Sequence, residues 1–177
     1  RAFRNEAIDV AALTLDEVLR ERDKGLALTV VLVFNVSAGA DMLLARPAIR
    51  RAADLRGRRI GRAQGTNADL LLTVALAEAG LLPSDVTLVE LSIGDQWQAW
   101  QRDAVDAVIT YEPVASRLLA AGARRLFDTS QAPNTIVDVL ALRSDVLADP
   151  TRGAAIRALT AAHFRGRALL EQQPAVA

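Results

Sequence analysis

Short runs of aliphatic residues alternate along the chain with longer segments whose apolar positions have the spacing of a helix. The strands are predicted at residues 9–13, 28–34, 59–63, 86–91, 107–110 and 125–127. One predicted helix begins at Thr14 with two acidic residues and ends at Gly25, and another runs from Asn67 to Ala79 before Gly80. This alternation is typical of mostly parallel sheets that helices cover on both faces, so the predicted fold class is α/β.

An internal repeat relates two parts of the chain, because residue 2 aligns with residue 99 and the offset of 97 then stays constant. Residues 2–9 read Ala-Phe-Arg-Asn-Glu-Ala-Ile-Asp, and residues 99–106 read Ala-Trp-Gln-Arg-Asp-Ala-Val-Asp. At the end of the following helix Gly25 aligns with Gly122. An equal-length match across helix, turn, strand and helix favours two similar lobes over a chance likeness between two helix–strand turns.

Two further extended segments, residues 40–47 and 135–143, are predicted to cross between the lobes. Lobe 1 is then expected to contain residues 1–43 and 139–177, and lobe 2 is expected to contain residues 44–138. Two crossing strands make a hinge, and the crevice beside such a hinge is a natural ligand site. The sequence therefore predicts a two-lobed α/β protein that binds a ligand.

The composition narrows the function classes. The chain has 177 residues, of which 51% are hydrophobic and 24% charged, and its 21 basic and 21 acidic side chains give a formal net charge of +0. A chain with no net charge has no overall electrostatic attraction for a polyanion, so no nucleic-acid partner is expected. The most apolar run, residues 26–34, is far shorter than the roughly 20 residues of a membrane-spanning helix, so no direct membrane insertion is expected.

The chain has no cysteine, which excludes disulfides, thiolate catalysis and iron–sulfur clusters. Its single histidine, His163, lies in a helical pattern without a second metal ligand one turn away, and we interpret it as a half-buried helix residue. No metal site, cofactor or catalytic residue is predicted. Trp100 aligns with Phe3 and is expected in the core, whereas Trp97 is expected either at the mouth of the crevice or in half-exposed packing.

Candidate ligand-binding residues follow the strands, where backbone N–H groups and the positive end of a helix point toward a ligand. After residues 59–63 come Gln64, Gly65, Thr66 and Asn67, of which Thr66 or Asn67 is alternatively a simple N-cap.

The equivalent places in the two copies of the repeat hold Thr14 with Asp16, and Tyr111 with Glu112. Asp41 and Asp138 lie on the crossings, where each is expected to meet either the ligand or the hinge backbone. Two of these carboxylates have structural alternatives, since Asp16 is also a natural helix cap and Asp138 a turn residue.

These motifs resemble those of a known family, the type 2 periplasmic substrate-binding proteins of ABC importers. The branch is the NMT1/THI5-like one, which handles nitrate, sulfonates, taurine and thiamine-pyrimidine precursors. Asp-Leu-Arg-Gly-Arg-Arg-Ile-Gly, residues 54–61, is the most specific of the motifs because it resembles the family's start of the second lobe. The other matching segments are residues 4–14, 37–41, 105–113 and 136–140.

The resemblance implies a non-enzymatic receptor that captures a small polar solute between its lobes and delivers it to the permease subunits of an importer. It implies a periplasmic or extracytoplasmic location, with a possible lipid anchor on a preceding segment. It also carries ligand contact onto Ser37, Thr14, Thr66, Asn67, Tyr111 and Glu112. The first strands of lobe 1, with the aromatic-rich loop that family members have there, are expected to be missing from this sequence.

Four acidic residues are predicted to approach one crevice while no arginine is clearly placed there: Asp16, Asp41, Glu112 and Asp138. Burying unpaired acids opposite an anion is costly, so a cationic or hydrogen-bonding ligand fits better than sulfonate or nitrate. Two alternatives stay open. One is a ligand-sensing effector domain of a regulator with the same fold, and the other is an enzyme that uses paired carboxylates as acid and base.

Overall fold

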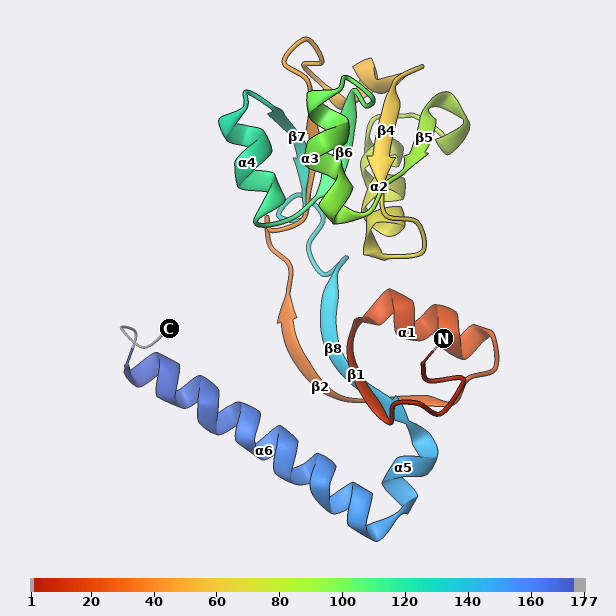
Figure 1. Cartoon of the computed structure of the whole chain (residues 1–177), viewed down its shortest axis with the longest axis vertical. Helices are drawn as coiled ribbons and strands as arrows, with labels where there is room; N and C mark the ends of the chain where they lie inside the picture. The colour runs from red at the N-terminus through yellow and green to blue at the C-terminus, as the bar shows by residue number, and fades with distance from the viewer. Residues whose placement is uncertain (1, 174–177) are drawn as a thin grey trace. The chain divides into compact units, whose positions relative to one another are not determined.

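The computed structural model describes residues 2–173 and divides into two compact units, which we treat separately (Figure 1). Unit 1 contains the chain up to Leu13, Val18–Phe34 and the chain from Val139 on, and unit 2 contains Thr14–Glu17 and Asn35–Asp138. Among the described residues, no helix has both the length and the hydropathy needed to cross a membrane.

Unit 2 is built around a five-stranded sheet with the strand order β5-β4-β6-β3-β7. Strand β4 pairs in parallel with β5 and β6, whereas β3 pairs antiparallel with β6 and β7. The sheet is therefore mixed. Strand β3, predicted as part of a crossing between the lobes, lies within unit 2 and pairs between β6 and β7. The elements are β3 (Met42–Ala45), η1 (Ala52–Leu55), β4 (Arg59–Arg62), α2 (Asn67–Glu78), η2 (Pro83–Asp85), β5 (Thr87–Glu90), α3 (Ile93–Gln101), β6 (Ala107–Thr110), α4 (Val114–Ala120) and β7 (Arg124–Asp128).

Helices cover both faces of this sheet because successive residues of a strand point to opposite sides. Leu43 packs into one buried cluster with Leu71 of α2, and Leu44 packs into another with Trp100 of α3. Gly61 is required on the second face, since a Cβ atom there would lie 2.7 Å from Leu91 Cδ1. The buried position predicted for Trp100 is confirmed.

Unit 1 contains a three-stranded sheet with the order β1-β8-β2. Leu142, Val146 and Ile156 form its buried cluster, against which Val10 and Val31 pack. His163 on α6 is half-buried, as predicted, and its ring contacts Phe34 edge-on at 5.3 Å between centroids. The elements are β1 (Val10–Thr14), α1 (Leu15–Asp23), β2 (Leu28–Val36), β8 (Val137–Arg143), α5 (Ser144–Ala148) and α6 (Pro150–Gln172).

The structure confirms the internal repeat. The aligned residues Glu6 and Asp103 both have left-handed backbones, with φ of 56° and 53°, and the aligned Gly25 and Gly122 have φ of 85° and 87°. Matching hydrogen bonds precede them, from Glu6 N to the Phe3 carbonyl and from Asp103 N to the Trp100 carbonyl. The two turns thus share one conformation.

The repeat continues into strands β3 and β8. Strand β3 ends just before Arg46, and β8 ends at the aligned Arg143, 97 residues later. Arg46 N donates to the Asp106 carbonyl at 2.9 Å, and Arg143 N donates to the Asp9 carbonyl at 3.1 Å. Strand β3 of the first copy pairs with β6 of the second, and β8 of the second copy neighbours β1 of the first. Each copy therefore supplies a strand to the sheet of the other.

Candidate ligand-binding site

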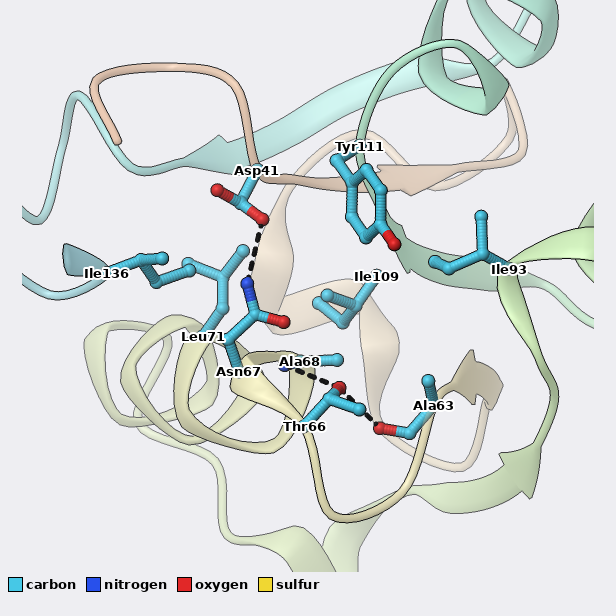
Figure 2. A pocket seen from close by; sticks show the side chains of 10 residues that line it. All are labelled: Asp41, Ala63, Thr66, Asn67, Ala68, Leu71, Ile93, Ile109, Tyr111 and Ile136. Atoms are coloured by element: carbon cyan, nitrogen blue, oxygen red, sulfur yellow. Dashed lines mark hydrogen bonds between the residues drawn. The ribbon is translucent and has the colours of Figure 1, made fainter. Parts of the chain in front are cut away.

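A small pocket lies within unit 2, at the carboxyl ends of the parallel strands β4 and β6 (Figure 2). Its volume is about 60 Å³, which is room for a head group of a few atoms. The carboxyl ends of parallel strands are where open α/β sheets bind ligands. The lining residues are Asp41, Ala63, Thr66, Asn67, Ala68, Leu71, Ile93, Ile109, Tyr111 and Ile136.

Thr66 is both the N-cap of α2 and a lining residue. Its Oγ1 accepts a hydrogen bond from Ala68 N at 3.2 Å and donates one to the Ala63 carbonyl at 2.8 Å. The predicted cap and the predicted pocket position therefore coexist in one side chain. Gln64 and Gly65 form the exposed turn before it, and neither lines the pocket.

A carboxylate that the sequence analysis missed occupies the positive end of α2. Asp69 Oδ2 accepts a hydrogen bond from Gly65 N at 2.7 Å, and Asp69 Oδ1 lies 2.7 Å from Nε of the buried Arg62. The spacing of Thr66 and Asp69, which is that of a capping box, is the signal that could have indicated it. The turn and the first residues of α2 are thus stabilised by the Asp69 side chain.

Asp41 is the charged residue of the pocket, and it is only 9% exposed. Ser37 Oγ donates to its Oδ2 at 2.6 Å, and Asn67 Nδ2 donates to its Oδ1 at 3.1 Å (Figure 2). Burial raises the pKa of Asp41, as does the nearby charge of Asp138, whereas the hydrogen bonds from Ser37 and Asn67 act in the opposite direction. Ser37, which was predicted as a ligand-binding residue, does not line the pocket and instead orients the Asp41 carboxylate through this hydrogen bond.

Tyr111 and six aliphatic side chains form the remaining walls. Tyr111 is 42% exposed, and Figure 2 shows its hydroxyl directed toward the other lining residues. The wall at Ile109 is fixed by Gln96, a fully buried residue whose Nε2 donates to the Ile109 carbonyl at 2.7 Å. Gln96, Leu71, Ile93, Ile109 and Ile136 were not predicted, because an apolar or amide side chain gives no local signal of a pocket.

Four of the predicted residues line the pocket: Asp41, Thr66, Asn67 and Tyr111. Glu112 does not, because its carboxylate accepts hydrogen bonds from N and Oγ of Ser116 at the start of α4, at 3.1 and 2.9 Å. Trp97 does not line it either, since the Arg117 guanidinium stacks 4.0 Å from the centroid of its ring.

The other predicted residues lie outside this pocket, and their ligand contacts stay predictions. Thr14 N donates to Glu17 Oε2 at 3.1 Å, and the Thr14 hydroxyl is buried without a hydrogen bond among the described residues. Asp16 lies in the first turn of α1, and Asp138 lies half-buried on β8. No group of three or more potential metal ligands occurs within residues 2–173.

A pocket of this kind, with apolar walls and a few convergent polar groups, defines a small-molecule-binding α/β protein. The chain belongs to the NMT1/THI5-like family, whose model matches residues 1–177.

Two solved structures share its fold with a TM-score of 0.83 and 26% identity, covering 98% of this chain and 60% of theirs. They are the alkanesulfonate-binding protein SsuA from Xanthomonas axonopodis bound to MOPS and the periplasmic aliphatic sulphonate-binding protein SsuA from Escherichia coli. A Brucella abortus protein described as a binding protein is 29% identical over 84 residues, which are 48% of this chain and 26% of the relative. The chain thus spans about 60% of the length of these structures.

Proposed function

We propose that this chain is part of the solute-binding component of an ABC-type importer, which works in the periplasm and delivers a small polar molecule to membrane permease subunits. The observation that carries the proposal is the pocket itself. In a member of the NMT1/THI5-like family it brings Asp41, Thr66, Asn67 and Tyr111 together at the carboxyl ends of two parallel strands. The sulfonate-binding proteins with the same fold support this role.

In this proposal the pocket of unit 2 holds one end of the solute, and closure about a hinge encloses the remainder. Its cavity of about 60 Å³ fits a head group and not a whole metabolite. Apart from the short segment Thr14–Glu17, which also belongs to unit 2, the chain passes from unit 1 into unit 2 after Phe34 and returns after Asp138. Such connections between two units are typical of hinge motion.

The proposed receptor performs no chemistry on its solute. None of the ten residues that line the pocket is a histidine, lysine, serine or cysteine, and the one lining hydroxyl of threonine type, Thr66, donates its proton to the Ala63 carbonyl and not to a base. Of the carboxylates considered for an acid–base pair, only Asp41 lines the pocket, and the carboxylate of Glu112 is bonded to Ser116.

Calorimetric titration with amines, pyrimidines, sulfonates and nitrate tests the proposal. We expect at least one solute to bind. We expect Asn67→Ala to weaken that binding about tenfold or more, because it removes a lining amide and the part-buried hydrogen bond that this amide donates to Asp41. Gln64→Ala is the matched control, since this exposed neighbour does not line the pocket. Equal affinity in all three proteins, or turnover of the solute seen by mass spectrometry, would contradict the proposal.

A further inference from the structure

The polar atoms around the pocket are mainly hydrogen-bond acceptors. Asn67 uses its amide nitrogen on Asp41, which leaves its amide oxygen on the pocket side in Figure 2. Thr66 uses its hydroxyl proton on the Ala63 carbonyl. The Asp41 carboxylate accepts two hydrogen bonds, and a carboxylate has about four lone-pair sites. The side-chain donors that remain are the Tyr111 hydroxyl and the second N–H of the Asn67 amide.

The helix end that would ordinarily attract an anion is partly occupied by the chain itself. Gly65 N donates to the Asp69 carboxylate, Ala68 N donates to Thr66 Oγ1, and Asp69 N donates to the Thr66 carbonyl at 3.2 Å. Asp69 also places a negative charge in the first turn of α2, where the helix dipole favours one. Three backbone N–H groups at the positive end of this helix are thus satisfied by the chain itself.

The pocket also lacks a cation to balance a bound anion. None of its ten lining residues is arginine or lysine, and within residues 2–173 the buried Asp41 carboxylate has no arginine or lysine partner. Asp138 adds a second negative charge close enough to act on Asp41. A sulfonate placed here would face a buried, unpaired carboxylate, which is strongly unfavourable.

We infer that the group bound in this pocket is a cationic nitrogen donor, a protonated amine or an amidinium, and that Asp41 is the residue that selects it. The inference rests on the proposed solute-binding function and specifies its ligand. A protonated amine would donate to Asp41 and to the Asn67 amide oxygen, while the aliphatic walls from Leu71, Ile93 and Ile109 would contact the adjoining carbon chain. An amino-sulfonate satisfies this rule if its amine, and not its sulfonate, occupies unit 2.

Matched probes that differ in one group test the inference on the full chain. The first pair is n-butylamine and butane-1-sulfonate, and the second is taurine and ethanesulfonate, which differ only by the amine. We expect the amine member of each pair to bind about tenfold or more tightly than its partner in calorimetric titrations, because a charge-assisted hydrogen bond is gained. In Asp41→Asn, which keeps the shape of the side chain, we expect both preferences to disappear.

The control is Asp103→Asn, which removes the same charge from unit 2 outside the pocket. Its side chain is 78% exposed, and its φ of 53° suits asparagine, so we expect both preferences to persist. Tighter binding of the sulfonates, unchanged in Asp41→Asn, would overturn the inference and leave the solute-binding function supported. Failure of all four probes to bind the folded chain would also overturn it, and the wider titration above would then decide the function separately.

Discussion

Arg46 and Arg143 occupy equivalent positions at the ends of the two exchanged strands, and each interacts with the left-handed turn of the other copy. Arg46 Nη2 lies 2.8 Å from Asp103 Oδ1, and Arg143 Nη1 lies 3.6 Å from the aligned Glu6 Oε2. The Arg46 guanidinium also lies 4.4 Å from the centroid of the Trp100 ring, whereas the aligned residue in the first copy is Phe3. The same arrangement of strand end and turn therefore occurs twice, and the arginine lies closer to the acidic residue of the turn in the Arg46 case.

The two copies differ more at the strand ends where ligand-binding residues were predicted. Strand β6 is followed by Tyr111, which lines the pocket, whereas the aligned residue at the end of β1 is Thr14, with a shorter side chain. Asp41 before β3 is buried, and the aligned Asp138 is half-buried. The difference teaches that the repeat conserves the scaffold while residues at a few strand ends set the chemistry of each copy.

Each of the two exchanged strands can be tested separately by removing a buried leucine from it. We expect Leu44→Ala in β3 to lower the stability of unit 2 by about 3 kcal/mol, because this fully buried side chain would leave a cavity. Leu142→Ala in β8 removes an equally buried leucine from unit 1. Both tryptophans, Trp97 and Trp100, lie in unit 2, so urea unfolding followed by tryptophan fluorescence reports on that unit.

Leu142→Ala is therefore the control, expected to leave the tryptophan transition within about 0.5 kcal/mol and to alter the helical signal in circular dichroism. Equal shifts of the tryptophan transition in both variants would show instead that the units unfold as one.

Much of the framework could be predicted from the sequence because it depends on local signals. Apolar runs placed the strands, and an aligned pair of glycines, Gly25 and Gly122, marked turns whose left-handed φ the structure confirms. The mixed sheet could not be predicted in this way. Whether β3 only connects two sheets or also pairs between β6 and β7 depends on contacts far apart in the chain, and its apolar residues suit both positions.

Only those pocket residues could be predicted that are polar and also follow a strand. Thr66, Asn67 and Tyr111 follow strands, and polar side chains there have a clear reason to meet a ligand. Glu112 follows the same pattern but bonds to Ser116, one turn later, and no sequence rule separates a helix-capping carboxylate from a ligand-binding one. The ligand contacts predicted for residues such as Thr14 stay predictions.

The aligned aspartates Asp9 and Asp106 sharpen the comparison through their different arginine contacts. The Asp106 carboxylate accepts hydrogen bonds from N, Nε and Nη2 of Arg59 at 2.8, 3.1 and 2.9 Å, and these hydrogen bonds hold the pKa of Asp106 below its usual range. The unfolded chain then binds more protons, so this stabilisation is present above about pH 4 and is lost as the pH falls through the folded-state pKa.

Because the Arg59 side chain is 43% exposed, we expect Asp106→Asn to cost only about 1 kcal/mol at pH 7, and less at pH 3, in urea unfolding. Asp9 Oδ1 lies 3.6 Å from nitrogens of both Arg143 and Arg152, so Asp9→Asn is expected to cost less, about 0.3 kcal/mol. An equal cost in both variants would show that the hydrogen bonds to Arg59 add nothing to the ion pair.

The last comparison concerns the aligned aspartates Asp41 and Asp138, and its expected effect on stability has the opposite sign. Burial raises the pKa of Asp41, so the folded chain holds its proton more tightly than the unfolded chain does. Stability therefore falls as the pH rises from about 4, the unfolded value, through the raised folded-state pKa, and the full cost is present once the carboxyl is ionised. Asp41→Asn does not titrate and keeps an acceptor for Ser37 or Asn67, so we expect a gain of about 0.5 kcal/mol at pH 7.

Thermal unfolding of Asp41→Asn and Asp138→Asn at pH 7 and at pH 4 measures this gain. Asp138→Asn relieves only the charge acting on Asp41 and is expected to stabilise the chain less. The gain should shrink at pH 4, because a carboxyl whose pKa is raised in the folded chain loses its charge as the pH falls. A residue whose replacement stabilises the fold while removing the preference for amines is retained for binding and not for folding. A loss of stability in Asp41→Asn would instead assign Asp41 to the hydrogen-bond network of Ser37 and Asn67, and its charge would then serve the fold.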